Sequence, residues 1–247
     1  MEEMFSIGRV AELLDVPPAT IRFWEQAGLF SIKKQENRYR CYSLQDLVHI
    51  ADVLFLRNSG VPVKQISQLN HCSTEQYQAK LQQLADHLNE KCNQYQQMYL
   101  RTKQQQERVQ EVLRLQHSFC QPEDIPFEKI VPFDYREKEK LLQYSSNPSS
   151  YVRYFDTRDM STETRCIIVP ADFSGPELYW QKKKKSTFFS FLIREWVEKD
   201  YQSDVLDSLS QIQKEHHTGV LLAQYLFTAE ENGLLTDFLK GYVEIVE

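Results

Sequence analysis

The chain has 247 residues, of which 41% are apolar and 12% are aromatic, and its net charge at pH 7 is −6. This length allows one large domain or two modest ones, and the apolar content is sufficient for packed cores. The sequence lacks both the roughly 18 consecutive apolar residues of a membrane helix and a secretion signal at its start. We therefore expect a cytoplasmic protein with no membrane partner.

The charge is distributed unevenly. Residues 1–70 contain eight basic and eight acidic side chains, residues 71–120 contain six and five, and residues 121–247 contain fifteen and twenty-two. Within residues 22–42, five basic side chains outnumber two acidic ones. Because DNA is bound largely through its phosphates, this local excess predicts DNA contact near the N-terminus, whereas the C-terminal half has the opposite charge.

The first predicted elements are two short helices. Apolar residues within 7–14 are spaced as on one face of a helix. Pro18 sits where proline is favoured, in the first turn of a second helix, and Gly28 ends that helix. Ile21 and Trp24 would face inward. Two short helices joined by a tight turn form a helix-turn-helix.

A β-hairpin pattern follows, with strands at Phe30–Lys34 and Arg38–Tyr42 and residues 35–37 at the tip. Ser43 then reads as the cap of a third helix that continues to Gly60, and Pro62 opens a short fourth helix. These two helices contain no residues with an evident binding or catalytic role, and we expect them to pack against and support the first two helices.

This first stretch of about 70 residues resembles the MerR family of transcription regulators. The resemblance rests on residues 7–11, 18–25, 28–29 and 37–43, and it continues through Asp46 and Leu47 to residues 60–66. The family usually has Gly before the first Tyr of the wing, where this chain has Arg38.

The resemblance implies a winged helix-turn-helix that binds double-stranded promoter DNA and works with RNA polymerase. Thr20, Arg22, Tyr39 and Tyr42 would mostly hold phosphates, whereas Phe23 and Gln26 would meet base edges. The expected DNA contacts are Thr20, Arg22, Phe23, Gln26, Lys33, Lys34, Arg38, Tyr39, Arg40 and Tyr42. The alternative for any one of these surface cations is an ordinary solvated charge.

Residues 75–117 contain neither Gly nor Pro and are rich in good helix formers. Their apolar positions recur mostly at intervals of three and four, which predicts an imperfect coiled-coil helix about 65 Å long. The narrow apolar stripe and the MerR resemblance both favour an antiparallel homodimer. A long helix packed within one chain is the alternative.

The chain beyond this helix predicts an α+β domain. Residues 118–150 read as irregular, with a linker near Pro122 and a short helix at 136–144. Strands are expected at 151–155, 164–170, 178–184, 187–196, 220–227 and 236–246, with a helix at 203–216 that Gly219 ends. This part resembles the second half of a GyrI-like effector-binding domain, chiefly through residues 219–227 and 237–246.

The C-terminal part is dense in aromatic residues, and most of them are expected in the core. The functional interpretation is a cavity for a flat, lipophilic cation, with Glu244 as the counter-charge that GyrI-like pockets provide. A solvated Glu244 is the alternative, and Glu177, Glu195 and Glu230 are weaker candidates. The expected effector site consists of Tyr151, Tyr154, Tyr179, Trp180, Tyr225, Tyr242 and Glu244.

No enzyme motif, cofactor motif or paired metal-ligand spacing is present, so we expect no catalysis, no cofactor and no metal. The five cysteines are odd in number and widely spread, which suits reduced thiols. The predicted fold is an all-α part (winged helix-turn-helix at 1–73 and coiled-coil helix at 74–119) followed by an α+β effector domain at 120–247. The alternatives are a metal- or thiol-sensing regulator and a ligand-sequestering protein.

Overall fold

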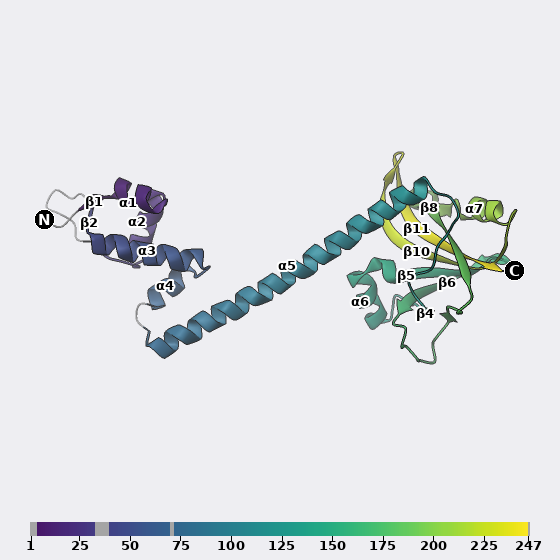
Figure 1. Ribbon diagram of the computed structural model, residues 1–247, viewed down its shortest axis with the longest axis horizontal. Coiled ribbons are helices and arrows are strands. Elements are labelled where there is room, and N and C mark those ends of the chain that lie inside the picture. The colour runs from purple at the N-terminus through teal and green to yellow at the C-terminus, as the bar shows by residue number, and fades with distance from the viewer. Residues whose placement is uncertain (1–3, 33–39, 70–71, 247) are drawn as a thin grey trace. The chain divides into compact units, whose positions relative to one another are not determined.

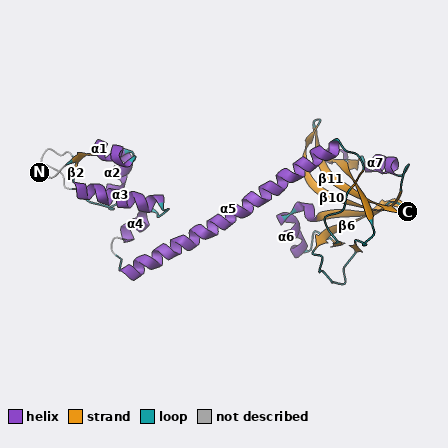
Figure 2. Cartoon of the chain, viewed as in Figure 1, coloured by secondary structure: helices purple, strands orange, loops and turns teal. Residues whose placement is uncertain are grey.

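The computed structural model describes residues 4–32, 40–69 and 72–246. The chain divides into two compact units, Met1–Gln97 and Met98–Glu247. Figure 1 shows the elements of each unit, and Figure 2 shows that the first is helical and the second rich in strands. Among the described residues, no helix combines the length and the apolar character needed to cross a bilayer.

The first unit begins with the two predicted helices, α1 (Ile7–Leu14) and α2 (Pro18–Gln26). The hydroxyl of Ser6 accepts a hydrogen bond from the backbone of Arg9 and so caps α1. Asp15 ends α1 in the left-handed region with φ 52°, which turns the chain sharply before Pro18. This turn sets the angle between the two helices.

The remaining elements of the first unit complete its core. They are β1 (Phe5–Ser6), β2 (Cys41–Tyr42), α3 (Leu44–Asn58), α4 (Val63–Leu69) and the start of α5 (Thr74–Gln116). Ser43 and Asp46 form the predicted capping box of α3. Val10, Ile21, Ile50 and Ile66 are fully buried in one apolar cluster. The buried side of α2 therefore packs in this cluster, and the residues on its other side are exposed within the described part of the chain.

The predicted hairpin falls mostly on residues 33–39, which lie outside the described residues. Residues 30–32 are not in a strand, and β2 pairs antiparallel with β1. The predicted strand is therefore wrong at residues 30–32, and the rest of the hairpin stays a prediction.

The long helix α5 confirms the predicted helix within one residue at each end. Its apolar positions Leu81, Leu88, Tyr95, Tyr99 and Leu113 are all exposed. They follow a heptad pattern: Leu81, Leu88 and Tyr95 occupy one heptad position, and Tyr99 and Leu113 occupy another. The helix thus carries an apolar stripe that its own chain leaves uncovered.

The second unit is built on one large antiparallel sheet, which has nine strands within the described residues. Its order is β3-β8-β11-β10-β5-β6-β4-β7, with β9 paired to β8. The strands are β3 (Gln121–Pro122), β4 (Lys129–Pro132), β5 (Tyr151–Asp156), β6 (Asp159–Val169), β7 (Trp180–Gln181), β8 (Thr187–Trp196), β9 (Gln202–Ser203), β10 (His217–Glu231) and β11 (Leu234–Val246). The helices are the end of α5, α6 (Lys138–Ser146), α7 (Val205–Ile212) and two short 3-10 turns, Pro148–Ser150 and Val197–Lys199.

Each face of this sheet has its own partners. On one face, Leu209 of α7 packs in a cluster with Phe155 and Leu239. On the other face, Val112 and Leu115 of α5 pack against Phe238, and Figure 1 shows the last turns of α5 beside the β10–β11 hairpin. Because neighbouring residues of a strand point to opposite faces, the strands β8, β10 and β11 contribute to both clusters.

Several sequence predictions for this unit are wrong in detail. The predicted helix at 203–216 ends at Ile212, and Gly219 lies inside β10, where its backbone oxygen accepts from Thr157. Only Trp180 and Gln181 of the predicted strand 178–184 are in a strand. The stretch read as irregular contains β3 and β4, whose short strands carry prolines at their ends.

A cluster of charges around the buried Lys240 joins α5 to the sheet. Lys240 of β11 is 4% exposed, and its ammonium contacts Glu111 of α5 and Glu123. Arg114 donates to both carboxylates, at 2.6 Å and 2.7 Å, and Ser190 donates to Glu123 at 2.6 Å. We call these five residues the Lys240 cluster. The buried ammonium of Lys240 has ionic partners, which offset the cost of removing its charge from water.

The Lys240 cluster predicts acid sensitivity. Hydrogen bonds from Arg114, and then from Lys240, lower the pKa of Glu111 to about 2, whereas an unfolded Glu has a pKa of about 4.3. A carboxyl whose pKa falls on folding stabilises the fold above its unfolded pKa, and this contribution is lost as the pH falls toward about 2. Glu111→Gln should therefore lower stability at pH 7 and flatten its decline between about pH 5 and 2. Urea titrations across this range measure both effects, and parallel profiles for the two proteins would contradict the prediction.

Candidate functional site

The first candidate surface is the outer face of α2. Ile21 and Trp24 are buried, as predicted, and this fixes the rotation of the helix. Arg22 and Gln26 are exposed, Thr20 is half-buried, and the Phe23 side chain is 54% exposed. The exposed ring of Phe23 is accessible for contact with another surface.

Arg40 lies beside this surface. Its Nε donates to Glu25 of α2 at 2.8 Å, and both side chains are partly buried. The ion pair ties the segment that follows the undescribed residues to α2. Arg40 therefore lies beside α2, and its charge is already compensated by Glu25, so its contact with DNA stays a prediction.

Tyr42 lies inside the first unit. It has no exposed surface, and its hydroxyl is buried and has no hydrogen-bond partner among the described residues. Burial is the largest cause that raises the pKa of Tyr42, so this hydroxyl stays protonated. Its contact with phosphate stays a prediction. Four further predicted contacts lie outside the described residues: Lys33, Lys34, Arg38 and Tyr39.

The second candidate site is a cavity of about 770 Å³ on the α7 side of the sheet in the second unit. Strands β5, β6, β8, β10 and β11 supply its floor, and residues around α6 supply one wall. The lining residues are Tyr135, Tyr144, Tyr151, Arg153, Glu163, Arg165, Glu195, Val197, Tyr201, Tyr225, Thr228, Leu235, Asp237 and Leu239.

A row of alternating charges crosses the cavity floor. Arg165 donates to Glu163 at 3.1 Å, and Glu163 accepts from Arg153 at 3.2 Å. Arg153 also forms a close ion pair with Glu195, across the small side chain of Ala223 that lies beside it in the sheet. Burial is the largest cause that raises the pKa of Glu195, and the nearby Arg153 opposes this rise. The four charges compensate one another in pairs.

Five tyrosines surround this row. Burial raises the pKa of Tyr144, Tyr151 and Tyr225, so their hydroxyls are neutral hydrogen-bonding groups near pH 7. Tyr144 packs edge-on against Tyr151, with ring centroids 6.1 Å apart. Such a wall provides flat apolar faces and polar tips together.

The predicted effector residues are divided between the two faces of the sheet. Tyr151 and Tyr225 line the cavity. Tyr154, Trp180 and Tyr242 belong to the apolar cluster on the opposite face, and Tyr179 packs against Tyr154. Glu244 has the same strand parity as Tyr242 and accepts from Ser186 at 2.6 Å. The structure therefore does not bring Glu244 together with Tyr151 and Tyr225.

Sequence reasoning did not select Arg153, Glu163 or Asp237 for the cavity, and it ranked Glu195 low. The available signal was alternation: Tyr151 and Arg153 are two residues apart on β5, and Asp237 and Leu239 are two apart on β11. Residues with this spacing share a face. The alternation does not reveal which face of the sheet borders the cavity.

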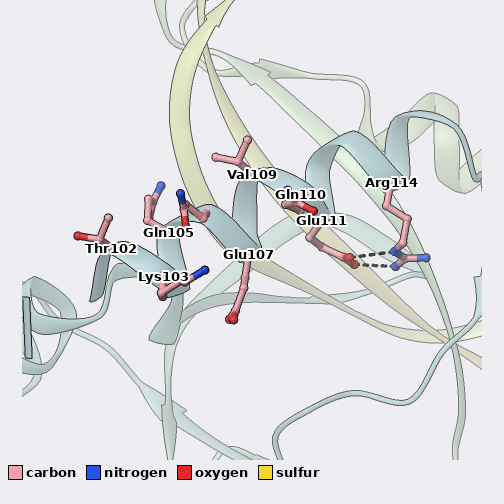
Figure 3. A pocket seen from close by; sticks show the side chains of 9 residues that line it. Thr102, Lys103, Gln105, Glu107, Val109, Gln110, Glu111 and Arg114 are labelled. Carbon is pink, nitrogen blue, oxygen red and sulfur yellow. Dashed lines mark hydrogen bonds and ion pairs between the residues drawn. The ribbon is translucent and has the colours of Figure 1, made fainter. Parts of the chain in front are cut away.

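A separate hollow of about 810 Å³ is lined entirely by α5, and Figure 3 shows its side chains along the helix. It contains Val109 of the apolar stripe together with Thr102 and Glu107. Because one helix supplies every described lining residue, this hollow is an open helix surface. Within the described residues, no group of three metal-ligating side chains gathers anywhere.

Comparison with known proteins assigns the first unit. Residues 5–70 match the family model described as MerR HTH family regulatory protein. A curated relative, the type II methyltransferase M.Eco47II of Escherichia coli, is 38% identical over 63 residues, which are 25% of this chain and 15% of that enzyme. The chain thus spans only a small part of the enzyme, and no methyltransferase activity follows.

Three solved structures are similar to this chain at low TM-scores. HiNmlR, a MerR family regulator lacking the sensor domain and bound to promoter DNA, is 19% identical over 40% of this chain and 79% of its own, with a TM-score of 0.34. A MerR family regulator from Bacillus thuringiensis is 24% identical over 45% and 98%, with a TM-score of 0.27. EcmrR, in an EcmrR–DNA complex, is 14% identical over 98% and 100%, with a TM-score of 0.38. At these values no shared activity or assembly follows, and the family model is the finding that counts: residues 5–70 of this chain form a MerR-family helix-turn-helix domain.

Proposed function

We propose that this protein is a cytoplasmic transcription regulator that binds promoter DNA as a homodimer and responds to a small effector. One observation carries the proposal: a MerR-type helix-turn-helix presents Arg22, Phe23 and Gln26 on an open helix face. That face lies within a segment of local positive charge. A helix of this kind reads base edges in the major groove while its cations hold phosphates.

The exposed stripe on α5 supports the homodimer. Leu88, Tyr95 and Tyr99 are each more than 40% exposed. Apolar side chains at heptad spacing are typical of a helix surface that a partner helix covers and shields from water. A second copy of α5, packed antiparallel, would cover them and set the distance between the two reading heads.

The cavity supports the response to an effector. It is large enough for a drug-sized molecule, and it combines aromatic walls with a few fixed charges. The family mechanism would then apply: both states bind DNA, and the effector lets the dimer distort the promoter so that RNA polymerase engages it. The observed cavity replaces the surroundings of Glu244 as the proposed effector site.

The DNA role predicts a specific result for Arg22. Arg22→Ala should weaken binding to a duplex, selected from a random library by the full-length protein, by about 1–3 kcal/mol, and it should reduce the salt slope by about one. Gel-shift titrations at several salt concentrations measure both quantities. Arg101→Ala, which removes an exposed charge on α5, is the control. Unchanged binding by Arg22→Ala would rule out the phosphate role.

Two other functions compete with this proposal. A metal- or thiol-sensing regulator would show thermal stabilisation by metal ions or a response to oxidants, and Cys120 and Cys166 both have pKa values raised by burial, which disfavours thiolate chemistry. A ligand-sequestering protein would bind dyes in the cavity, and the full-length protein would select no duplex from the random library. Its ligand binding would be unchanged when Arg22 is replaced.

A further inference from the structure

Four consecutive lysines, Lys182–Lys185, lie between β7 and β8 in the second unit. They belong to residues 121–247, where twenty-two acidic side chains outnumber fifteen basic ones. No two of the remaining lysines and arginines in this part of the chain are adjacent in sequence. The run therefore concentrates positive charge at one place in an otherwise acidic unit.

Protection of the sheet edge does not account for this run. β7 lies at one end of the sheet, and lysines along such a strand hinder pairing with other chains. However, β7 ends at Gln181, and Lys183–Lys185 follow it in a turn. The turn is closed by a hydrogen bond from the backbone N–H of Ser186 to the backbone oxygen of Lys183, at 3.2 Å. These three lysines thus lie beyond the edge that they would protect.

The turn is fixed at both ends. The backbone N–H of Lys182 donates to the backbone oxygen of Glu128 at 2.8 Å. On the other side, the hydroxyl of Ser186 donates to Glu244 of β11 at 2.6 Å, and β8 begins at Thr187. An anchored turn presents its side chains from a defined place, so little backbone freedom is lost when a partner binds.

Three of the four charges are uncompensated. Lys182 forms an ion pair with Asp124, and its side chain is only 20% exposed. Lys183, Lys184 and Lys185 are all exposed, and within the described residues their side chains form neither an ion pair nor a hydrogen bond. We call these three residues the lysine turn. It carries three adjacent positive charges that are free to meet an external anion.

The chemistry of the lysine turn suits phosphates better than a protein surface. Lysine is depleted at protein–protein interfaces, whose affinity depends on aromatic and other apolar anchors. Ser186 and Thr187, which follow the turn, are polar and provide no such anchor. Ammonium groups on flexible stems act instead as point charges on phosphates, and duplex DNA presents about one negative charge per 1.7 Å of its axis.

A membrane surface is the other common polyanion. Basic clusters that bind anionic lipids usually lie next to a membrane-spanning helix or on an amphipathic helix. The lysine turn joins two strands, and no described helix is adjacent to it in the chain. Its position therefore favours nucleic acid over lipid.

We propose that the lysine turn binds the phosphate backbone of duplex DNA outside the site that α2 reads. This inference rests on the proposed function, in which the first unit binds DNA. Phosphate contacts carry no sequence information, so the second unit adds affinity and salt dependence without adding sequence specificity. Because both units belong to one chain, the second contact is intramolecular once the first unit is bound.

Duplexes of two lengths test the proposal. The short duplex contains the selected site alone. The long duplex adds an arm of about 30 base pairs on each side, which is about 100 Å and exceeds the length of α5, about 65 Å. Gel-shift titrations of the full-length protein at several salt concentrations should give a steeper salt slope for the long duplex.

Replacing Lys183, Lys184 and Lys185 together by glutamine removes the three charges and keeps the turn polar. On the long duplex, this variant should lower the salt slope by about two or more, because each lost phosphate contact removes about 0.9. Its affinity for the long duplex at about 50 mM salt should fall at least about tenfold. Its affinity for the short duplex should change less than about twofold.

Matched variants separate the lysine turn from net charge. Lys138, Lys199 and Lys214 are exposed at scattered positions of the same unit. Replacing these three by glutamine makes the same change in net charge and should leave the binding of both duplexes within about twofold of the wild type. Replacing the three lysines of the turn by arginine keeps the charges and should retain the wild-type affinity and slope.

The outcomes separate this inference from the proposed function. If the glutamine variant of the turn binds the long duplex like the wild type, or if the scattered variant loses as much affinity, the role of the lysine turn is overturned while DNA binding by the first unit stands. If no duplex is selected, the proposed function fails. The turn is then tested on a long duplex of random sequence at low salt, where equal binding by the wild type and the glutamine variant overturns the inference.

Phosphatidylserine vesicles test the membrane alternative. The wild type and the glutamine variant should sediment equally with them. Vesicle binding that the glutamine variant loses, together with unchanged binding to the long duplex, would assign the lysine turn to a lipid surface and overturn the proposal.

Discussion

Replacing Lys240 by alanine should lower the free energy of unfolding of the second unit by about 1.5–3 kcal/mol. Lys240 is buried and contacts both Glu111 and Glu123, so its removal leaves two carboxylates with Arg114 as their remaining cation. Each carboxylate loses a charged hydrogen bond to Lys240 but keeps Arg114 and part of its contact with water, so the cost is that of charged hydrogen bonds and not of an uncompensated buried charge. Urea unfolding of the full-length protein, followed by near-ultraviolet circular dichroism, measures the loss.

Two further variants show whether charge is the cause. Lys240→Met keeps most of the volume of the side chain and should be almost as destabilising as the alanine variant. The triple variant Lys240→Met, Glu111→Gln and Glu123→Gln removes the unpaired charges and should recover most of the stability. Lys183→Ala, at an exposed position before β8, should change stability by less than about 0.5 kcal/mol. A stable Lys240→Met protein would show that packing, and not charge, makes Lys240 important.

Placing aspartates at Leu88 and Tyr95 should convert the proposed homodimer to a monomer and abolish binding to the selected duplex. These side chains are 47% and 67% exposed on α5, so the change does not disturb the core of their own chain. Leu84, in contrast, packs against the core of the first unit and is unsuitable for this test. The aspartates at the centre of an antiparallel helix pair would repel each other, and their charges would be buried without partners.

Sedimentation velocity and gel-shift titration measure the two effects together. Gln97→Asp with Gln104→Asp is the matched control, because these exposed residues lie on the opposite side of the heptad from the stripe. The control protein should remain a dimer that binds DNA. A dimer that persists in the Leu88 and Tyr95 variant would place the interface elsewhere on the chain.

Much of the fold was predictable because local signals agreed with one another. The buried pair Ile21 and Trp24, together with the turn before Pro18, defined α2. The absence of Gly and Pro defined α5, and Asn232 and Gly233, both with positive φ, defined the β10–β11 turn. Each of these features depends only on residues that are close together in the chain, so it can be predicted from the sequence.

The candidate site was harder to predict because it depends on contacts between strands distant in sequence. Arg153 of β5 reaches Glu195 of β8, and two strands lie between them in the sheet. No local pattern reveals such a pair. The choice of Glu244 followed from correct alternation with Tyr242, but that alternation placed both residues on the face opposite the cavity. The strands β3 and β4 were missed because prolines near a short apolar run also indicate irregular structure.

The strand β11 separates two opposite charges by its register alone. Asp237 and Leu239 face the cavity, whereas Phe238 and Lys240 face α5. Deleting one residue from the β10–β11 turn would exchange these faces, because side chains in a strand alternate with a period of two. The hollow would then receive an ammonium and the helix would meet a carboxylate. The length of one tight turn therefore sets which sign of charge faces the cavity and which faces α5.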